Sequence, residues 1–206
     1  AGNAIAVQNG AEAELNSVTV GGGNYLAVFA TNGSNVRINN LNAASGVYFS
    51  ASAGNIRNSR IETTSAVGVG VVNDQSDLFI EDSDIFGKAA GITVTNHGAV
   101  NFSRGTLASD GNALVVNQSG HFIGNNLNIQ SGNRAIQAFA GGSVTLSGFS
   151  QIQGVSGIYA DGAKLDLTDL QINSTGASLG HGIWLENLDG LCASGCEAAS
   201  LNRGNI

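Results

Sequence analysis

Residues 91–96 have the sequence Gly-Ile-Thr-Val-Thr-Asn, and close variants of this stretch return along the whole chain. A small residue is followed by an apolar residue, a spacer, a second apolar residue, another spacer and an amide. Alternation of this kind, with a period of two, is typical of a β-strand with one buried face. The pattern recurs as Ala-Ile-Ala-Val-Gln-Asn at residues 4–9 and as Gly-Ile-Trp-Leu-Glu-Asn at residues 182–187.

These segments form an internal repeat of roughly 22 residues. The first apolar position recurs at nearly even intervals and is always Ile, Leu or Val: Ile5, Leu26, Val47, Val69, Ile92, Leu114, Ile136, Ile158 and Ile183. The position two residues later is also apolar throughout: Val7, Val28, Phe49, Val71, Val94, Val116, Ala138, Ala160 and Leu185. Two uninterrupted apolar columns indicate that each repeat buries this side against its neighbours.

Each repeat contains two further alternating segments, separated by turn residues such as Asn9-Gly10 and Gly141-Gly142. A single coil cannot bury its own apolar face, so the coils must stack. A leucine-rich repeat would need a consensus Asn among several Leu, and a sandwich of hairpins would not produce in-phase columns. The sequence therefore predicts an all-β protein, a right-handed parallel β-helix (β-solenoid) of about nine coils of roughly 22 residues, with three strands per coil.

A third column, four residues after the first apolar position, mixes amides with small residues. Its members are Asn9, Ala30, Ala51, Asn73, Asn96, Gln118, Ala140, Gly162 and Asn187. Stacked side-chain amides bond to one another along a repeat axis, so we expect a structural ladder. Binding of a sugar or a metal is the alternative, although Ala and Gly interrupt the column.

The composition excludes several classes of function. Only 11% of the residues are charged and the net charge is -7, so the phosphates of nucleic acid and an anionic membrane surface would be repelled. No stretch approaches about 18 apolar residues, and we expect no direct membrane insertion of this segment. The 30 glycines agree with β structure that has many tight turns.

Two cysteines, Cys192 and Cys196, lie close together near the C-terminus, separated by Ala-Ser-Gly. A small disulfide loop or half of a metal site would fit this spacing. Because no second Cys or His pair follows, we predict the disulfide, which implies an oxidising compartment. We expect residues 1–206 to form a single β-helix domain, a fragment of a longer secreted chain, in which residues 188–206 form an irregular coil around the cysteine loop.

The tripeptide Gly180-His181-Gly182 resembles one motif of the polygalacturonases, in which a histidine assists two or three aspartates. An inverting glycosidase needs two carboxyl groups, one acid and one base. The coil before His181 offers Asp161 and Asp166 but no adjacent Asp pair, and no Arg-x-Lys follows. We therefore predict no catalytic residue, with His181 in the turn before an ordinary strand.

The run Glu81-Asp82-Ser83-Asp84 carries hard oxygen ligands that suit Ca²⁺. It lacks the ligand spacing of a recognised calcium loop, and acidic turns are usually solvated. We predict no metal site and no cofactor.

Outward positions of the repeat bring aromatic and acidic residues together in the last three coils. In the expected register, Phe139, Tyr159 and Trp184 lie close together beside Asp161 and Glu186. Exposed aromatic rings flanked by acids suit contact with a sugar or a protein. The alternative is that loops or a neighbouring domain cover them. We predict this group as the binding site.

Irregular coils of this length, rich in Gly, Asn and Ser and without Pro, resemble the passenger domains of bacterial autotransporters, particularly the pertactin-like and self-associating adhesins. The close spacing of Cys192 and Cys196 also resembles that of the cysteine pairs in those passenger domains. The resemblance implies export across the outer membrane to the bacterial cell surface, with anchoring by a C-terminal β-barrel beyond these residues.

The function implied by the resemblance is that of a non-enzymatic adhesin or virulence factor. It would mediate cell adhesion, autoaggregation by self-association between cells, or binding of a host surface protein or glycan. The alternative from a different class is a secreted polysaccharide-degrading β-helix enzyme, a lyase or a glycoside hydrolase, because that scaffold carries both.

Overall fold

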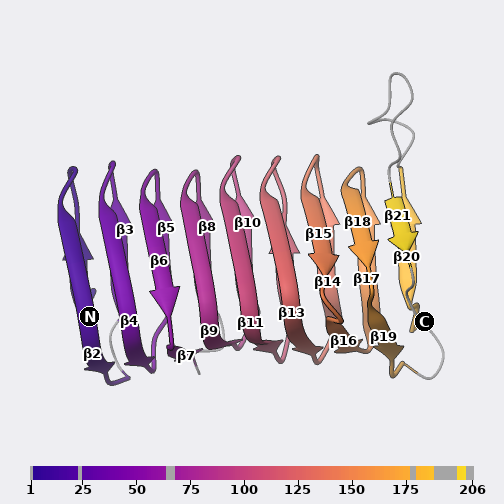
Figure 1. Ribbon diagram of the computed structural model, residues 1–206, viewed down its shortest axis with the longest axis horizontal. Helices are drawn as coiled ribbons and strands as arrows, with labels where there is room; N and C mark the ends of the chain where they lie inside the picture. The colour runs from indigo at the N-terminus through magenta and orange to yellow at the C-terminus, as the bar shows by residue number, and fades with distance from the viewer. Residues whose placement is uncertain (1, 23–24, 64–67, 177–179, 188–198, 203–206) are drawn as a thin grey trace.

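The computed structural model describes residues 2–22, 25–63, 68–176, 180–187 and 199–202, and these ranges contain no helix. The strands stack as a parallel β-solenoid of about eight turns of about 22 residues. Figure 1 shows the turns side by side along the long axis, with the N-terminal turn at one end. The prediction of an all-β protein built from stacked parallel repeats is confirmed.

One side of the solenoid is a nine-stranded parallel sheet, sheet A, which contains the repeat motif. Each strand pairs with the equivalent strand of the turns before and after it. Its strands, in order, are β1 (Ile5–Val7), β3 (Val28–Thr31), β5 (Val47–Ser50), β8 (Val69–Asp74), β10 (Ala90–Thr95), β12 (Asn112–Val116), β14 (Arg134–Phe139), β17 (Ser156–Asp161) and β20 (Ile183–Glu186).

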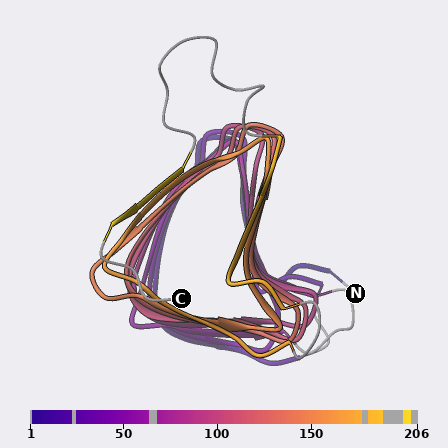
Figure 2. The same cartoon turned by 90° about the vertical axis from the view of Figure 1, so that its right-hand side faces the viewer.

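A second parallel sheet of twelve strands, sheet B, covers the other two sides of the three-sided outline seen in Figure 2. Its long strands run across both sides, and in other turns two shorter strands replace one long strand. Its strands are β2 (Glu12–Val20), β4 (Asn35–Ala43), β6 (Ala53–Arg57), β7 (Arg60–Thr63), β9 (Asp77–Gly87), β11 (Ala99–Ser109), β13 (His121–Ser131), β15 (Ser143–Ser147), β16 (Gln151–Gly154), β18 (Lys164–Thr168), β19 (Gln171–Ser174) and β21 (Ala199–Asn202).

The long strands of sheet B turn the corner through one residue in the left-handed region. These residues lie in the middle of β2, β4, β9, β11 and β13, and they are Ser17, Asn40, Asp82, Arg104 and Asn126, with φ between 48° and 60°. The expected second and third strands of a coil are therefore continuous in these turns. At the C-terminal end, β21 lies within residues 188–206, where the sequence predicts an irregular coil, and pairs with β18.

The interior is a continuous apolar column, as the repeat predicts. Ile92 pairs with Leu114, Leu114 with Ile136, and Ile136 with Ile158, and all four side chains are fully buried. The inward positions of sheet B, such as Phe102, are buried in the same way. Full burial of a side chain of this size stabilises a fold by about 1.5–3 kcal/mol, so stacking of the turns supplies the main favourable term.

The predicted register is wrong in two turns, by two residues in each. Val28, not Leu26, pairs with Ile5, and Val71, not Val69, pairs with Ile92. Both alternatives keep apolar residues inward, because a shift of two preserves the alternation. In the second turn, the register is decided by the residue just before the first apolar position. That residue is Ala27, which is fully buried, whereas the predicted register would place the bulky Tyr25 there.

This corrected register gives every turn a left-handed residue where sheet A ends. The column contains Asn32 and Gln75 in place of the predicted Ala30 and Asn73. All nine members have φ between 46° and 59°: Asn9, Asn32, Ala51, Gln75, Asn96, Gln118, Ala140, Gly162 and Asn187. Asn and Gly tolerate this backbone conformation best, which accounts for their frequency.

The expected amide ladder is limited to isolated contacts. Asn32 Nδ2 donates to Asn9 Oδ1 at 3.3 Å, but Asn96 donates to Asp74. Asn73, shifted by the new register, lies in the inward column and is fully buried. Its amide nitrogen donates to the backbone carbonyls of Ser76 and Ala99, both at 3.0 Å. The amide residues therefore stabilise the corners and the core, and they do not form a continuous ladder.

Candidate functional site

The structure brings all five predicted site residues onto the outer face of sheet A, across β14, β17 and β20. Tyr159 is paired in register with Trp184 on the next turn. Phe139 is paired with Asp161, which is paired with Glu186. Parallel strands lie about 4.8 Å apart, so residues in register are direct neighbours.

Tyr159 is the centre of this group. Its hydroxyl donates a hydrogen bond of 2.8 Å to Glu186 Oε2, and its ring meets the edge of Trp184 with 5.8 Å between centroids. The guanidinium carbon of Arg134 lies 4.2 Å from the centroid of the Tyr159 ring. The bond to Glu186 raises the pKa of the Tyr159 hydroxyl, with smaller contributions from burial and from the charges of Glu186 and Asp161.

Of the five predicted site residues, Trp184 is the most exposed, and its ring contacts two neighbouring rings. Its side chain is 41% exposed, and His181 packs against it with 4.6 Å between ring centroids. Asp161 accepts a hydrogen bond of 2.7 Å from Asn187 Nδ2. We call Arg134, Tyr159, His181, Trp184 and Glu186 the Tyr159 cluster. It offers a cation, an anion and an accessible indole within one small area.

Sequence reasoning missed Arg134 as a member of this cluster. Strict alternation from Gln137 would place Ala135 outward and Arg134 inward, but Ala135 and Ile136 are both buried. Because the alternation breaks at that corner, Arg134 faces outward. The small residue that precedes the first apolar position in every turn is the signal that could have located it. His181 was known as a motif residue, but its contact with Trp184 depends on the turn geometry.

The register correction also changes the outward columns in the N-terminal half. Phe29 and Val72 occupy the column that contains Tyr48 and Tyr159, where the predicted register places Ala27 and Gly70. Phe29 stacks on Tyr48 with 5.5 Å between centroids. Sheet A therefore carries a second aromatic pair, on β3 and β5, at the opposite end of the strand order from the Tyr159 cluster.

The acidic run at residues 81–84 is engaged by arginines from neighbouring turns. Arg104 forms ion pairs with Glu81 and Asp82, and Arg57 lies 3.3 Å from Glu81. The hydrogen bond from Arg104 lowers the pKa of Asp82. Within the described ranges, no three His, Cys, Asp or Glu side chains gather as a metal site would require. Cys192 and Cys196 lie outside the described residues.

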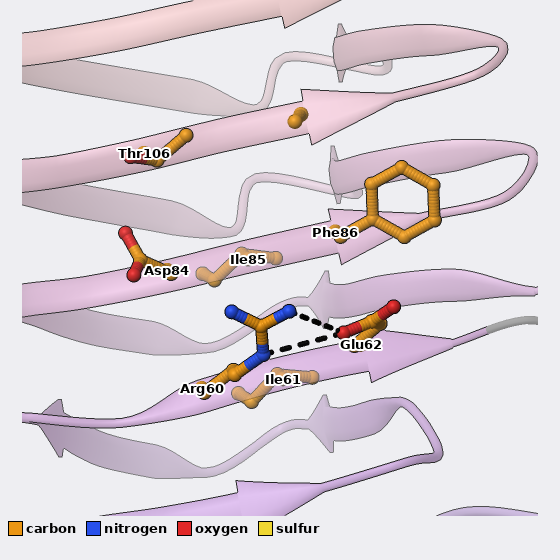
Figure 3. Close-up of a pocket in the computed structure, with 8 residues that line it drawn as sticks. Arg60, Ile61, Glu62, Asp84, Ile85, Phe86 and Thr106 are labelled. Carbon is orange, nitrogen blue, oxygen red and sulfur yellow. Dashed lines mark hydrogen bonds and ion pairs between the residues drawn. The ribbon is translucent and has the colours of Figure 1, made fainter.

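A hollow of about 320 Å³ lies away from sheet A, on the side of sheet B formed by β7 and the C-terminal halves of β9 and β11. Figure 3 shows Arg60 and Glu62 on one strand, Asp84 and Phe86 on the next, and Thr106 on the third. None of these side chains was predicted as a binding residue. This side of the solenoid begins after the left-handed residue in the middle of each long strand. These residues are Asp82, two positions before Asp84, and Arg104, two positions before Thr106.

The fold and site define the chain as a member of one structural class, the parallel β-solenoids. No known protein family matches the sequence, and neither a curated protein nor a solved structure gives a significant match. Over the described residues, no helix is both long and apolar enough to cross a membrane.

Proposed function

We propose that this chain is a surface-exposed, non-enzymatic binding protein, an adhesin or virulence factor that resembles an autotransporter passenger. The observation that supports this proposal is the Tyr159 cluster: a partly exposed Trp184 packed against Tyr159 and His181 on the outer face of sheet A. An amphipathic ring fixed by neighbours loses little conformational entropy when a partner binds it. A host surface protein, a glycan or another copy of the chain would be the partner.

The finer fold assignment belongs to the same proposal. We propose a right-handed solenoid, because connections between parallel strands of one sheet are right-handed in nearly all proteins. We also propose nine coils, one for each strand of sheet A. A long rod that repeats one face suits a surface protein, because weak contacts along its length add up when many copies are displayed.

A bead assay tests the adhesive function. Fluorescent beads coated with the full 206-residue chain are incubated with epithelial monolayers and with each other, and adherent or aggregated beads are counted. We expect Trp184→Ala to reduce adherence severalfold. Phe79→Ala is the matched control, because Phe79 is more exposed than Trp184 but lies on sheet B.

The bead counts also contain the outcomes that contradict the proposal. Wild-type beads that adhere and aggregate no better than albumin-coated beads would refute it, as would equal losses in the two variants. Thermal unfolding of both variants is measured alongside. We expect Trp184→Ala to unfold near the wild-type temperature, since only a surface ring is removed; a large drop would show that Trp184 is a packing residue.

A polysaccharide-degrading enzyme is the second candidate, and one observation favours it. Asp161 and Glu186 are register neighbours on adjacent turns, with His181 near the same face. Paired carboxyl groups on one face are what glycoside hydrolysis requires. Both are engaged, Glu186 by Tyr159 and Asp161 by Asn187, which favours a structural role. Release of reducing sugar from pectin that is abolished by His181→Ala or Asp161→Asn would establish the enzyme.

A further inference from the structure

Six successive strands of sheet B present a second outward surface, independent of the Tyr159 cluster. These strands are β7, the C-terminal halves of β9, β11 and β13, then β16 and β19, all paired in register. Two outward residues per strand form two parallel rows. The pairs are Arg60/Glu62, Asp84/Phe86, Thr106/Ala108, Asn128/Gln130, Gln151/Gln153 and Gln171/Asn173. We call this surface the β7–β19 face.

The first three strands of the β7–β19 face contain the hollow shown in Figure 3. Its volume of about 320 Å³ is at the lower end of the range for small-molecule sites, which suits one or two small ring systems. The Phe86 ring is half-buried and forms part of the lining. It offers an apolar surface beside the charged groups of Arg60, Glu62 and Asp84.

Several polar atoms around the hollow are available to a ligand. Arg60 directs two nitrogens to Glu62 Oε2, at 3.2 and 2.7 Å, and this pairing fixes both side chains. The hydrogen bond to Glu62 is the main cause that raises the pKa of Arg60, and the charge of Asp84 adds a smaller contribution. Asp84 accepts no side-chain hydrogen bond from any described residue. The carboxylate of Asp84, beside an apolar ring and with no hydrogen bond from a described side chain, can accept hydrogen bonds from adjacent hydroxyl groups of one ligand.

The last three strands of the β7–β19 face carry only carboxamides in the two rows. They are Asn128, Gln130, Gln151, Gln153, Gln171 and Asn173, and five of the six are exposed. Gln130 donates to Asn128 Oδ1 at 3.3 Å within its own strand. A carboxamide is uncharged and both donates and accepts hydrogen bonds. A hydroxyl group has the same two capacities, so the two groups are suitable hydrogen-bond partners.

Charge narrows the ligand class. The β7–β19 face carries one cation, Arg60, and two anions, Glu62 and Asp84, on a chain with a net charge of -7. A sulfated or carboxylated polymer would be repelled, and an apolar peptide would leave six carboxamides without partners. A neutral polyhydroxyl chain satisfies both rows. The strands repeat about every 4.8 Å along the axis, a spacing close to the length of one sugar unit.

We propose that the β7–β19 face binds a neutral polysaccharide chain that lies along the long axis of the solenoid. One sugar stacks on Phe86 in the hollow and donates hydroxyl hydrogen bonds to Asp84 and Glu62. The following sugars bond to the carboxamide rows. Each contact is weak, and the sum over successive strands supplies the affinity. This site goes beyond the proposed adhesive function, because it uses other residues on another side.

Titration calorimetry of the full chain with neutral hexasaccharides tests the site. The probes are cellohexaose, maltohexaose, mannohexaose and xylohexaose, with heparin as the anionic comparison. We expect at least one hexasaccharide to bind. Phe86→Leu retains the apolar bulk without the flat ring, and Asp84→Asn retains the shape without the charge. Each is expected to weaken binding about tenfold.

Length dependence tests the carboxamide rows separately from the hollow. The double variant Gln151→Ala/Gln153→Ala is expected to weaken the bound hexasaccharide severalfold while leaving affinity for the matching disaccharide unchanged. Phe79→Ala, in the N-terminal half of β9, is the control outside the β7–β19 face and is expected to bind as wild type does. Far-UV circular dichroism and thermal melting confirm that each variant is folded.

Four experimental outcomes would contradict the proposed polysaccharide site. These are the absence of binding by all four hexasaccharides, undiminished binding by Phe86→Leu and Asp84→Asn, an equal loss of disaccharide binding in the glutamine double variant, and tighter binding of heparin than of any neutral probe. The test is separable from the adhesion assay. If Trp184→Ala loses adherence while no sugar binds, only the polysaccharide site fails; if sugars bind while wild-type beads do not adhere, only the adhesive function fails.

Discussion

Replacing Gly54 by alanine would place a methyl group in space that the Phe49 ring already fills. The new Cβ would lie 2.3 Å from Phe49 Cε1 and 2.6 Å from Cζ, and 3.0 Å from Leu78 Cδ1. Carbon atoms in contact prefer a separation of about 3.5–4.0 Å, so the ring would have to move by about 1 Å or more. Phe49 is fully buried, and its neighbours leave little room for that movement.

The expected cost of Gly54→Ala is about 1–3 kcal/mol of unfolding free energy, as for other overpacked cores. Phe49→Leu removes the clashing ring atoms and leaves a small cavity, at a cost of about 1–2 kcal/mol. In the double variant the new methyl group occupies part of that cavity. We therefore expect the double variant to be no less stable than Phe49→Leu alone, with a coupling energy of at least about 1 kcal/mol.

Equilibrium unfolding in guanidinium chloride, followed by far-UV circular dichroism, measures all three variants and the wild type. Gly21→Ala is the matched control, because no atom of the described residues, apart from its chain neighbours, lies within 4 Å of its added Cβ, and its effect is expected to stay within about 0.5 kcal/mol. Additive effects of Phe49→Leu and Gly54→Ala would refute the reasoning, since they would show that the two positions do not compete for the same space. Equal stability of Gly54→Ala and Gly21→Ala would refute it as well.

Two further predictions concern polar groups. Asn73→Ala removes two hydrogen bonds to the carbonyls of Ser76 and Ala99 in the core, and we expect a loss of about 1–3 kcal/mol in guanidinium unfolding; an unchanged midpoint would contradict this role. Glu186→Ala is expected to lower the pKa of Tyr159 towards its ordinary value of 10.0, measured by the absorbance of the ionised phenol. Because the bond favours the protonated phenol, its contribution to stability is complete below pH 10.0 and disappears as the pH rises through the higher pKa of the folded state; superimposable titrations would count against the bond.

Much of the candidate site could be predicted because its members occupy equivalent positions of the repeat. Tyr159 and Trp184 follow Ile158 and Ile183 directly, so the repeat alone makes them outward neighbours. Arg134 could not be found in this way, because its orientation depends on a corner where two consecutive residues are buried. The alternation of inward and outward residues predicts side-chain direction within a regular strand but not across a bend.

The hollow at Phe86 was beyond prediction for a related reason. Its lining comes from three turns, and a residue on one turn meets its neighbours only when the loop lengths between them are known. Arg60 is paired with Asp84, and Asp84 is paired with Thr106, but the chain between the first pair is longer than the chain between the second. Such differences in turn length are invisible to an average period.

The sequence by itself determined that the protein is a stacked parallel β repeat with one apolar side, because a period of two within strands and a period near 22 between them leave a single way to bury the Ile, Leu and Val columns. Only the tertiary structure decided the register of the second and fourth turns. Shifts of two residues preserve the alternation, so the choice depends on side-chain volume and backbone conformation at the corners. Ala27 fits the buried corner that Tyr25 cannot enter, and Asn32 adopts the left-handed conformation at the other end of the strand.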